Sequence, residues 1–161
     1  MRSVIRSDPR TVVRAVADPE LPELTLHDLG IVRDVTVDGD TAIVTITPTY
    51  TGCPATQVMA SEIKQALHGA GWPAVEVHIV LSPPWTTEWI TAEGRAKLQR
   101  AGIGQPASLQ DGWEQAVAAP VACPRCGSRR TRRLGAFGSS ACREPFVCGA
   151  CREAFERIKP I

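Results

Sequence analysis

The chain of 161 residues lacks any apolar run close to the ~20 residues that a helix needs to cross a bilayer. Its first ten residues include three arginines and lack the apolar core of a secretory signal peptide, so we expect a cytoplasmic protein. Excess charge is also missing, because the net charge is only +1. The hydrophobic share of 43% and charged share of 22% are normal for a soluble globular protein, which argues against disorder of the whole chain.

Cysteine is nearly absent from residues 1–120, where Cys53 stands alone, whereas residues 121–161 hold five cysteines. Charge divides at the same place. The first part has nine Lys and Arg against fourteen Asp and Glu, and the second has nine against three. The stretch from Gly102 to Pro120, at the end of the first part, is weakly periodic and contains several Gly and Pro residues, as linkers do. We therefore predict a first domain over residues 1–105, a linker over 106–122 and a second domain over 123–161.

The first part alternates helical and strand patterns. Ser7, Asp8 and Pro9 are typical of a helix start, and Asp18-Pro19-Glu20 would end that helix. The later segments are predicted as strands at 31–37 and 42–47 around a turn at 38–40, a helix at 54–68, a strand at 75–81 and a helix at 91–101. The order α-β-β-α-β-α predicts a two-layer α+β domain.

Cys53 lies between Gly52 and Pro54, directly before the second predicted helix. Pro54 is a natural first helical residue, which would make Cys53 the N-cap. Unpaired amides and the helix dipole favour a thiolate there, and a thiolate can bind soft metals or attack electrophiles. Cys53 can equally be a small buried filler. A cysteine hydrolase is disfavoured because no His or Asn can be identified as its partner.

Carboxylates precede the first strand at Asp18, Glu20 and Asp28, the last of these next to His27. They can reach the same end of the sheet as Cys53 and act there as metal ligands. Asx turns and helix caps are the alternative role for such residues.

The second part contains two C-x2-C pairs, Cys123/Cys126 and Cys148/Cys151, with 21 residues between them. Four thiolates at this spacing predict a tetrahedral structural zinc site in a small ribbon. A rubredoxin-like iron site is the main alternative, although Arg152 rather than glycine follows the second pair. Disulfides do not suit a cytoplasmic chain. Few apolar residues are available for a core, so the metal must hold the module; they are Leu134, Phe137, Phe146, Val147 and Phe155.

Cys142 is left over from the four-cysteine set. It is either a spare thiol or a ligand of a second, labile metal. A group of four arginines flanks the first pair, at Arg129, Arg130, Arg132 and Arg133. They can hold phosphates, form a solvated face or dock on an acidic partner, and the acidic first part makes direct nucleic-acid binding unlikely.

Four motifs together resemble the SufT-like iron–sulfur assembly domain, over roughly residues 5–105: Asp18-Pro-Glu-Leu-Pro22, His27-Asp-Leu-Gly-Ile-Val32, Thr47-Pro-Thr-Tyr-Thr-Gly-Cys-Pro54 and Pro83-Pro-Trp-Thr86. The tail resembles the PaaD family specifically, through Cys123-Pro-Arg-Cys-Gly-Ser128, Phe137-Gly-Ser-Ser-Ala-Cys142 and Cys148-Gly-Ala-Cys151. The combination is more specific than either half.

The resemblance implies a non-catalytic accessory subunit or assembly factor of the phenylacetyl-CoA epoxidase system in aerobic phenylacetate breakdown. Such a protein would help deliver or mature iron–sulfur clusters, with the reductase subunit as partner, and would bind iron or a cluster transiently. The candidate ligands carried over from the family are Asp18, Glu20, Thr49, Thr51, Cys53 and Cys142. Zinc would be structural. A homodimer, which could supply a second ligand, and a structural adaptor that binds no iron both remain open.

Overall fold

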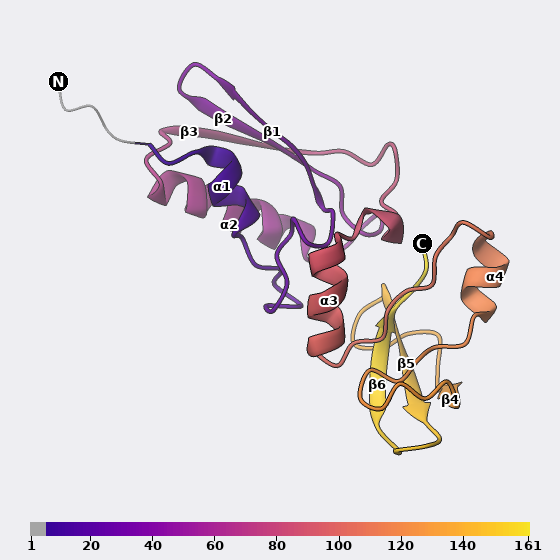
Figure 1. Ribbon diagram of the computed structural model, residues 1–161. Helices are drawn as coiled ribbons and strands as arrows, with labels where there is room; N and C mark the ends of the chain where they lie inside the picture. Colours follow the sequence, from indigo (N-terminus) through magenta and orange to yellow (C-terminus); the bar gives the residue numbers. More distant parts are fainter. Residues whose placement is uncertain (1–5) are drawn as a thin grey trace. The chain divides into compact units, whose positions relative to one another are not determined.

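Residues 6–161 are described by a computed structural model, which divides into two compact units (Figure 1). The first unit ends at Trp85 and the second comprises Thr86–Ile161. The first carries the loop of Cys53 and the second carries the four-cysteine set, so each candidate site can be described within its own unit. No helix within residues 6–161 is long and apolar enough to span a bilayer.

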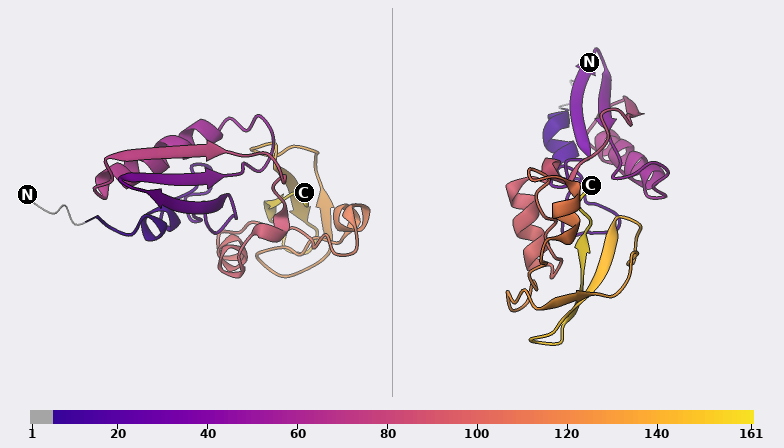
Figure 2. Two further views of the ribbon diagram at one scale, coloured as in Figure 1. Left: turned by 90° about the horizontal axis from the view of Figure 1, so that it is seen from above. Right: turned by 90° about the vertical axis from the view of Figure 1, so that its right-hand side faces the viewer.

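The first unit follows the predicted order of elements. They are α1 (Pro9–Arg14), β1 (Val32–Asp38), β2 (Thr41–Ile46), α2 (Thr56–Gly69) and β3 (Ala74–Ile79). The strand order is β1-β2-β3, with β1 antiparallel and β3 parallel to β2. Both helices lie on one face of this sheet (Figures 1 and 2). The fold is therefore the expected two-layer α+β arrangement.

The core of this unit lies between the sheet and the helices. β2 alternates strictly, because Ala42, Val44 and Ile46 are buried while the residues between them are half-buried. The apolar side of α2 meets this face through residues at helical spacing, among them Ile63 and Leu67, neither of which is exposed.

The start of α1 agrees with the sequence prediction, but its end does not. Asp8 is the N-cap, and its carboxylate accepts hydrogen bonds from the amides of Arg10 and Thr11 at 3.4 and 3.2 Å. The helix already ends at Arg14, before the predicted stop at Asp18-Pro19-Glu20. The reason is a tertiary contact: Ala17 forms an isolated antiparallel bridge with Thr25, which draws the chain out of the helix.

The segments that carry the family motifs gather at one end of the sheet. Val32 at the start of β1 pairs with Ile46 at the end of β2, and the amide of Thr47 donates to the carbonyl of Ile31 at 2.8 Å. The indole of Trp85 donates to the carbonyl of Leu29 at 2.8 Å. The loops before β1, after β2 and after β3 thus share this end.

The second unit begins with the 3-10 turn η1 (Thr87–Trp89), followed by α3 (Ala92–Arg100) and α4 (Trp113–Ala118). Its antiparallel sheet contains β4 (Thr131–Arg133), β5 (Arg143–Cys148) and β6 (Ala154–Ile158), in the order β4-β5-β6. The ends of the unit meet, because the amide of Thr87 and the hydroxyl of Thr86 donate to the carbonyl of Ile161 at 3.0 and 2.8 Å.

The core of the ribbon is smaller than predicted. Phe146 and Phe155 are buried and stack with ring centroids 5.8 Å apart. Leu134 and Phe137, expected inside, are instead 50% and 71% exposed. They fall in or next to the turn between β4 and β5, where the three-residue β4 is too short to cover them. Much of the remaining core is made by the cysteines themselves.

A buried ion pair fastens the segment of α4 to the ribbon. Arg157 Nε donates to Glu144 Oε1 at 2.5 Å, and each residue is only 2% exposed. Arg157 Nη2 also donates to the carbonyl of Val117 in α4 at 3.2 Å. Gly104 bridges to Arg157, and its amide donates to the carbonyl of Glu156 at 2.7 Å.

These contacts bear on the domain boundaries predicted from the sequence. The expected linker, residues 106–122, contains α4, and α3 belongs with the second unit rather than with the first domain of 1–105. The division at Trp85 falls just after the turn of Pro83 and Pro84.

Candidate metal centre and cysteine loop

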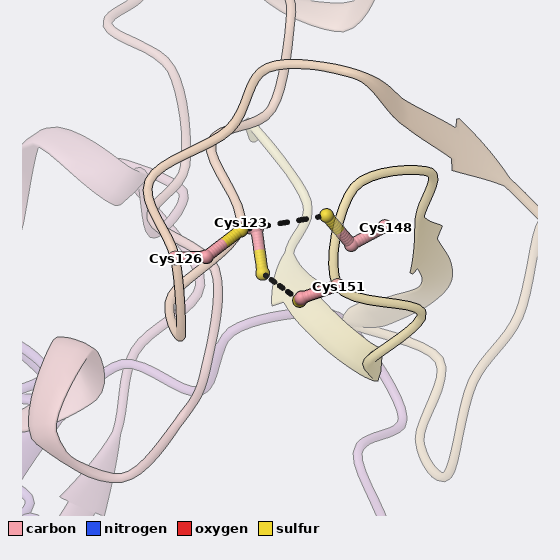
Figure 3. Close-up of side chains that lie close together, drawn as sticks. All are labelled: Cys123, Cys126, Cys148 and Cys151. Atoms are coloured by element: carbon pink, nitrogen blue, oxygen red, sulfur yellow. Dashed lines mark hydrogen bonds between the residues drawn. The ribbon is translucent and has the colours of Figure 1, made fainter.

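Two tight turns hold the four cysteines of the ribbon. Cys123 and Cys126 come from the turn before β4, while Cys148 ends β5 and Cys151 lies in the turn before β6. Figure 3 shows the four side chains converging from the two turns. In residues 6–161 they form the only group of three or more His, Cys, Asp or Glu close enough to hold one metal ion.

The sulfur positions fit a tetrahedral zinc. Zinc–sulfur bonds of ~2.3 Å at tetrahedral angles place the sulfur atoms ~3.8 Å apart. The Sγ atoms of Cys123 and Cys151 are 3.7 Å apart, those of Cys126 and Cys148 are 3.6 Å apart, and all four lie within 4.8 Å of one another. These four side chains would hold the metal, and bound zinc would supply the cross-link that the small core lacks.

Each turn ends in a residue with positive φ. Gly127 has φ 73° and its amide donates to the carbonyl of Cys123 at 2.8 Å. Arg152 has φ 63° and its amide donates to the carbonyl of Cys148 at 3.0 Å. The second turn therefore repeats the first, although an arginine stands where glycine is favoured.

The thiols of the second turn differ in acidity when no metal is bound. The pKa of Cys148 is lowered to about 6, because backbone amides at Cys151 and Ala150 donate to its sulfur and outweigh the effect of burial. For Cys151, the hydrogen bond from the Glu153 amide lowers the pKa, but burial and three neighbouring thiols raise it to about 12. Of these two thiols, Cys148 is therefore the one that loses its proton more readily.

Cys53 does not cap α2, contrary to our expectation. The N-cap is Ala55, and Cys53 lies in a preceding turn in which its carbonyl accepts from the amide of Thr56 at 3.1 Å. Pro54 lies inside this turn, because the hydrogen bond from the Thr56 amide to the Cys53 carbonyl closes the turn just before the regular helix begins. Cys53 is only 7% exposed, as in the buried-filler interpretation, yet it lies within one turn of the helix start.

Thr56, the first residue of α2, was not singled out from the sequence. Its side chain is 8% exposed, and its hydroxyl oxygen has no hydrogen-bond partner among the described residues. A threonine three residues after a cysteine, in the first helical turn, is the pattern that could have drawn attention to it.

The other candidate ligands of this loop region do not belong to any group of three or more His, Cys, Asp or Glu within residues 6–161 that could hold one metal ion. Asp18 is buried, and its Oδ1 accepts from the amides of Glu20 and Leu21 at 2.9 and 2.8 Å, which is turn chemistry. Glu20 and Thr51 are exposed and Thr49 is half-buried. They share one end of the sheet with Cys53 through the loops described above.

Cys142 is remote from the four-cysteine set along β5. It precedes the first residue of that strand, whereas Cys148 is its last, and it is not in the metal-binding group. Its Sγ lies 3.1 Å from the hydroxyl of Ser140. Arg129, Arg130, Arg132 and Arg133 are exposed, and Arg133 in β4 forms an ion pair of 2.6 Å with the buried Glu144.

Comparison with known families divides the chain into the same two parts. Residues 8–79 match the family described as iron–sulfur cluster assembly protein. Residues 110–159 match the PaaD zinc β-ribbon domain.

Curated relatives and a solved structure agree with this division. The chain is 41% identical over 146 residues to an Escherichia coli K12 protein provisionally named as one of the subunits of 1,2-phenylacetyl-CoA epoxidase, covering 91% of this chain and 87% of that protein. It is 38% identical over 92 residues to the Fe-S protein maturation auxiliary factor YitW of Bacillus subtilis 168, covering 55% and 87%. A Bacillus anthracis crystal structure of a DUF59 domain matches with 33% identity and a TM-score of 0.51, covering 56% of this chain and 87% of that one.

The E. coli relative matches along both units, whereas the maturation factor and the DUF59 structure match only about half of the chain. The motifs of both halves, the four-cysteine geometry and the similarity over nearly the full length agree. The chain belongs to the PaaD family, in which an iron–sulfur cluster assembly domain precedes a zinc ribbon.

Proposed function

We propose that this protein is a non-catalytic accessory factor that helps to deliver or mature iron–sulfur clusters for a phenylacetyl-CoA epoxidase system. The observation that carries the proposal is the union of two modules in one chain. An iron–sulfur assembly domain over residues 8–79 is joined to a PaaD zinc ribbon over residues 110–159. The reductase subunit is the proposed recipient, since an iron–sulfur reductase is the component that needs clusters. The protein would act in the cytoplasm.

Cys53 is the proposed ligand for the cargo iron or cluster. Its loop and the turn of Asp18 and Glu20 lie at the same end of the sheet, so a carboxylate could serve as a second ligand. One thiolate holds a cluster weakly, and the remaining ligands would come from Thr49, Thr51, a partner protein or a second copy of this chain. Weak attachment suits a carrier, because the recipient must be able to remove the cargo.

Zinc in the ribbon has a structural role in this proposal. All four sulfur ligands come from the protein, which leaves no open position for chemistry. The metal would hold the turns that carry the arginines beside β4 and so maintain a basic surface for docking on a protein partner.

Metal content after anaerobic reconstitution with iron and sulfide tests the role of Cys53. We expect about one zinc per chain in the wild type and in Cys53→Ala, with iron retained only by the wild type. Cys142→Ala is the matched control, since it removes another cysteine outside the zinc set. Iron bound equally by wild type and Cys53→Ala would contradict the proposed ligand.

A second candidate function is a structural adaptor that binds no iron. It is favoured by the burial of Cys53, which is only 7% exposed, and by the absence of a three-ligand group from the described part of the first unit. Co-purification with the epoxidase subunits that survives Cys53→Ala, together with iron-free wild type, would select the adaptor.

A further inference from the structure

A cationic groove lies on the first unit and is lined by residues of α1, of the segment before β1 and of β1 itself. It encloses about 180 Å³ between α1, the residue His27 and the start of β1. Its charged lining residues are Arg10, Arg14, Arg33 and Asp34. None of the candidate cluster ligands lines it.

Two features of the backbone bring the three arginines together. Arg10 and Arg14 are four residues apart on α1 and therefore lie on the same side of that helix. Arg33 is the extra residue of a β-bulge, because Val32 pairs with Ile46 while Asp34 pairs with Thr45. A bulge redirects the side chains beside it, and here the four consecutive residues 32–35 all line the groove.

Hydrogen bonds to backbone carbonyls hold two of the arginines of the groove in place. Arg10 Nε donates to the carbonyl of Val35 at 3.2 Å, and Arg33 Nη1 donates to the carbonyl of Gly30 at 3.2 Å. The Oδ1 atom of Asp34 accepts a hydrogen bond from the amide of Val35 at 2.9 Å. The side chain of Arg14 is exposed and has no hydrogen bond or ion pair with any of residues 6–161.

The groove is positively charged although the unit that carries it is acidic in composition. Residues 6–85 contain only five Lys and Arg against ten Asp and Glu, yet three of those five cations line one groove. With Asp34 included and His27 neutral, the lining carries a net charge of +2. A net positive lining of this kind attracts an anion.

We propose that the groove binds a phosphate group, either as inorganic phosphate or as the phosphomonoester of a small metabolite. A phosphate monoester carries about −1.5 to −2 charges at neutral pH, which matches the lining. Guanidinium groups present paired donors that fit phosphate oxygens. Val13 and Val35, which are 0% and 7% exposed, also line the groove, and charged groups beside such apolar surroundings attract an anion more strongly than in water.

Phosphate titration of the full zinc-loaded chain tests the proposal. Inorganic phosphate and methyl phosphate would be added at constant ionic strength while the ¹⁵N-labelled arginine Nε–H signals are followed by NMR. We expect saturable shifts for Arg10, Arg14 and Arg33, and at least about tenfold weaker binding in Arg14→Gln, which loses charge-assisted hydrogen bonds. Tighter binding of methyl phosphate would identify a phosphomonoester ligand, and tighter binding of inorganic phosphate would identify the free ion.

Two control variants separate this groove from general attraction to positive charge. Lys64→Gln removes one exposed charge from the same unit, and Arg132→Gln removes one from the ribbon; neither residue lines the groove. We expect both to bind phosphate within about twofold of the wild type. Shifts that never saturate, or equal weakening in Arg14→Gln and either control, would overturn the proposal.

Discussion

Replacing Arg152 with glycine should tighten zinc binding by the ribbon. Arg152 has φ 63° in the turn after Cys151, the position that glycine occupies after Cys126. Its side chain is exposed and forms no hydrogen bond or ion pair with residues 6–161. The substitution therefore removes an unfavourable backbone conformation without removing a contact.

The magnitude follows from two opposing effects. A left-handed conformation costs an ordinary residue ~1–2 kcal/mol. Glycine avoids this cost but loses more conformational entropy on folding, which offsets ~0.5–1 kcal/mol. The net gain of ~1 kcal/mol corresponds to about a fivefold gain in zinc affinity, since metal binding and folding are coupled in such small modules. Gly127→Ala should weaken binding by a similar factor, although a Cβ there would meet no atom within 4 Å.

Competition with a chromogenic zinc chelator under anaerobic conditions would measure both affinities. Arg152→Ala is the matched control, because it removes the same side chain but keeps a non-glycine residue at positive φ. We expect it to bind zinc like the wild type. If Arg152→Ala gained as much as Arg152→Gly, or if Gly127→Ala lost nothing, backbone conformation would not be the cause.

Three further predictions concern the second unit. Glu144→Gln leaves Arg157 buried without its carboxylate partner, so the free energy of unfolding, measured by urea denaturation, should fall by ~3–5 kcal/mol. The control Glu93→Gln breaks an exposed ion pair with Arg100 and should lower it by less than ~1 kcal/mol. Gly104→Ala should lower the free energy of unfolding by ~1–3 kcal/mol in the same measurement, because the added Cβ would lie 2.8 Å from the Cβ of Arg157. In the control Gly69→Ala the added Cβ would meet no atom within 4 Å, and the stability should not fall. Zinc binding should release more protons below pH 6 than at pH 7.5, because Cys148, with its pKa of about 6, carries a proton in the metal-free turn only at the lower pH. Calorimetry in buffers of different ionisation enthalpy would count the protons, and the same number at both pH values would mean that the metal-free turn lacks the amide bonds to Cys148.

Local signals predicted much of this structure. Asp8 and Pro9 begin α1, Thr91 caps α3 with its hydroxyl, and the cysteine spacing located the metal centre. What escaped prediction depends on individual backbone hydrogen bonds that helix and strand patterns do not encode. The bridge of Ala17 with Thr25 shortens α1, and the turn at Cys53 delays α2.

The candidate site in the first unit was less accessible to sequence reasoning. The motifs identified its loops, and the register of β1 with β2 brings two of them to one end of the sheet. Burial of Cys53 and the bulge at Arg33 are properties of the packed sheet, for which a single sequence carries no periodic signal. The roles of Asp18, Glu20, Thr49 and Thr51 as ligands therefore stay predictions.

The Arg157–Glu144 pair also limits where the chain can be cut. A ribbon excised at Val121, just before its first cysteine, would lose the Val117 carbonyl that accepts from Arg157 and the Gly104 backbone that packs on it. A guanidinium held in the interior would then be opened to water on one side, and the excised fragment would be less stable than its metal site alone suggests. Zinc ribbons are often treated as cassettes that can be moved between proteins. We expect this ribbon to keep its full stability in another protein only when it is transferred together with the preceding helices, from about Thr86 onward.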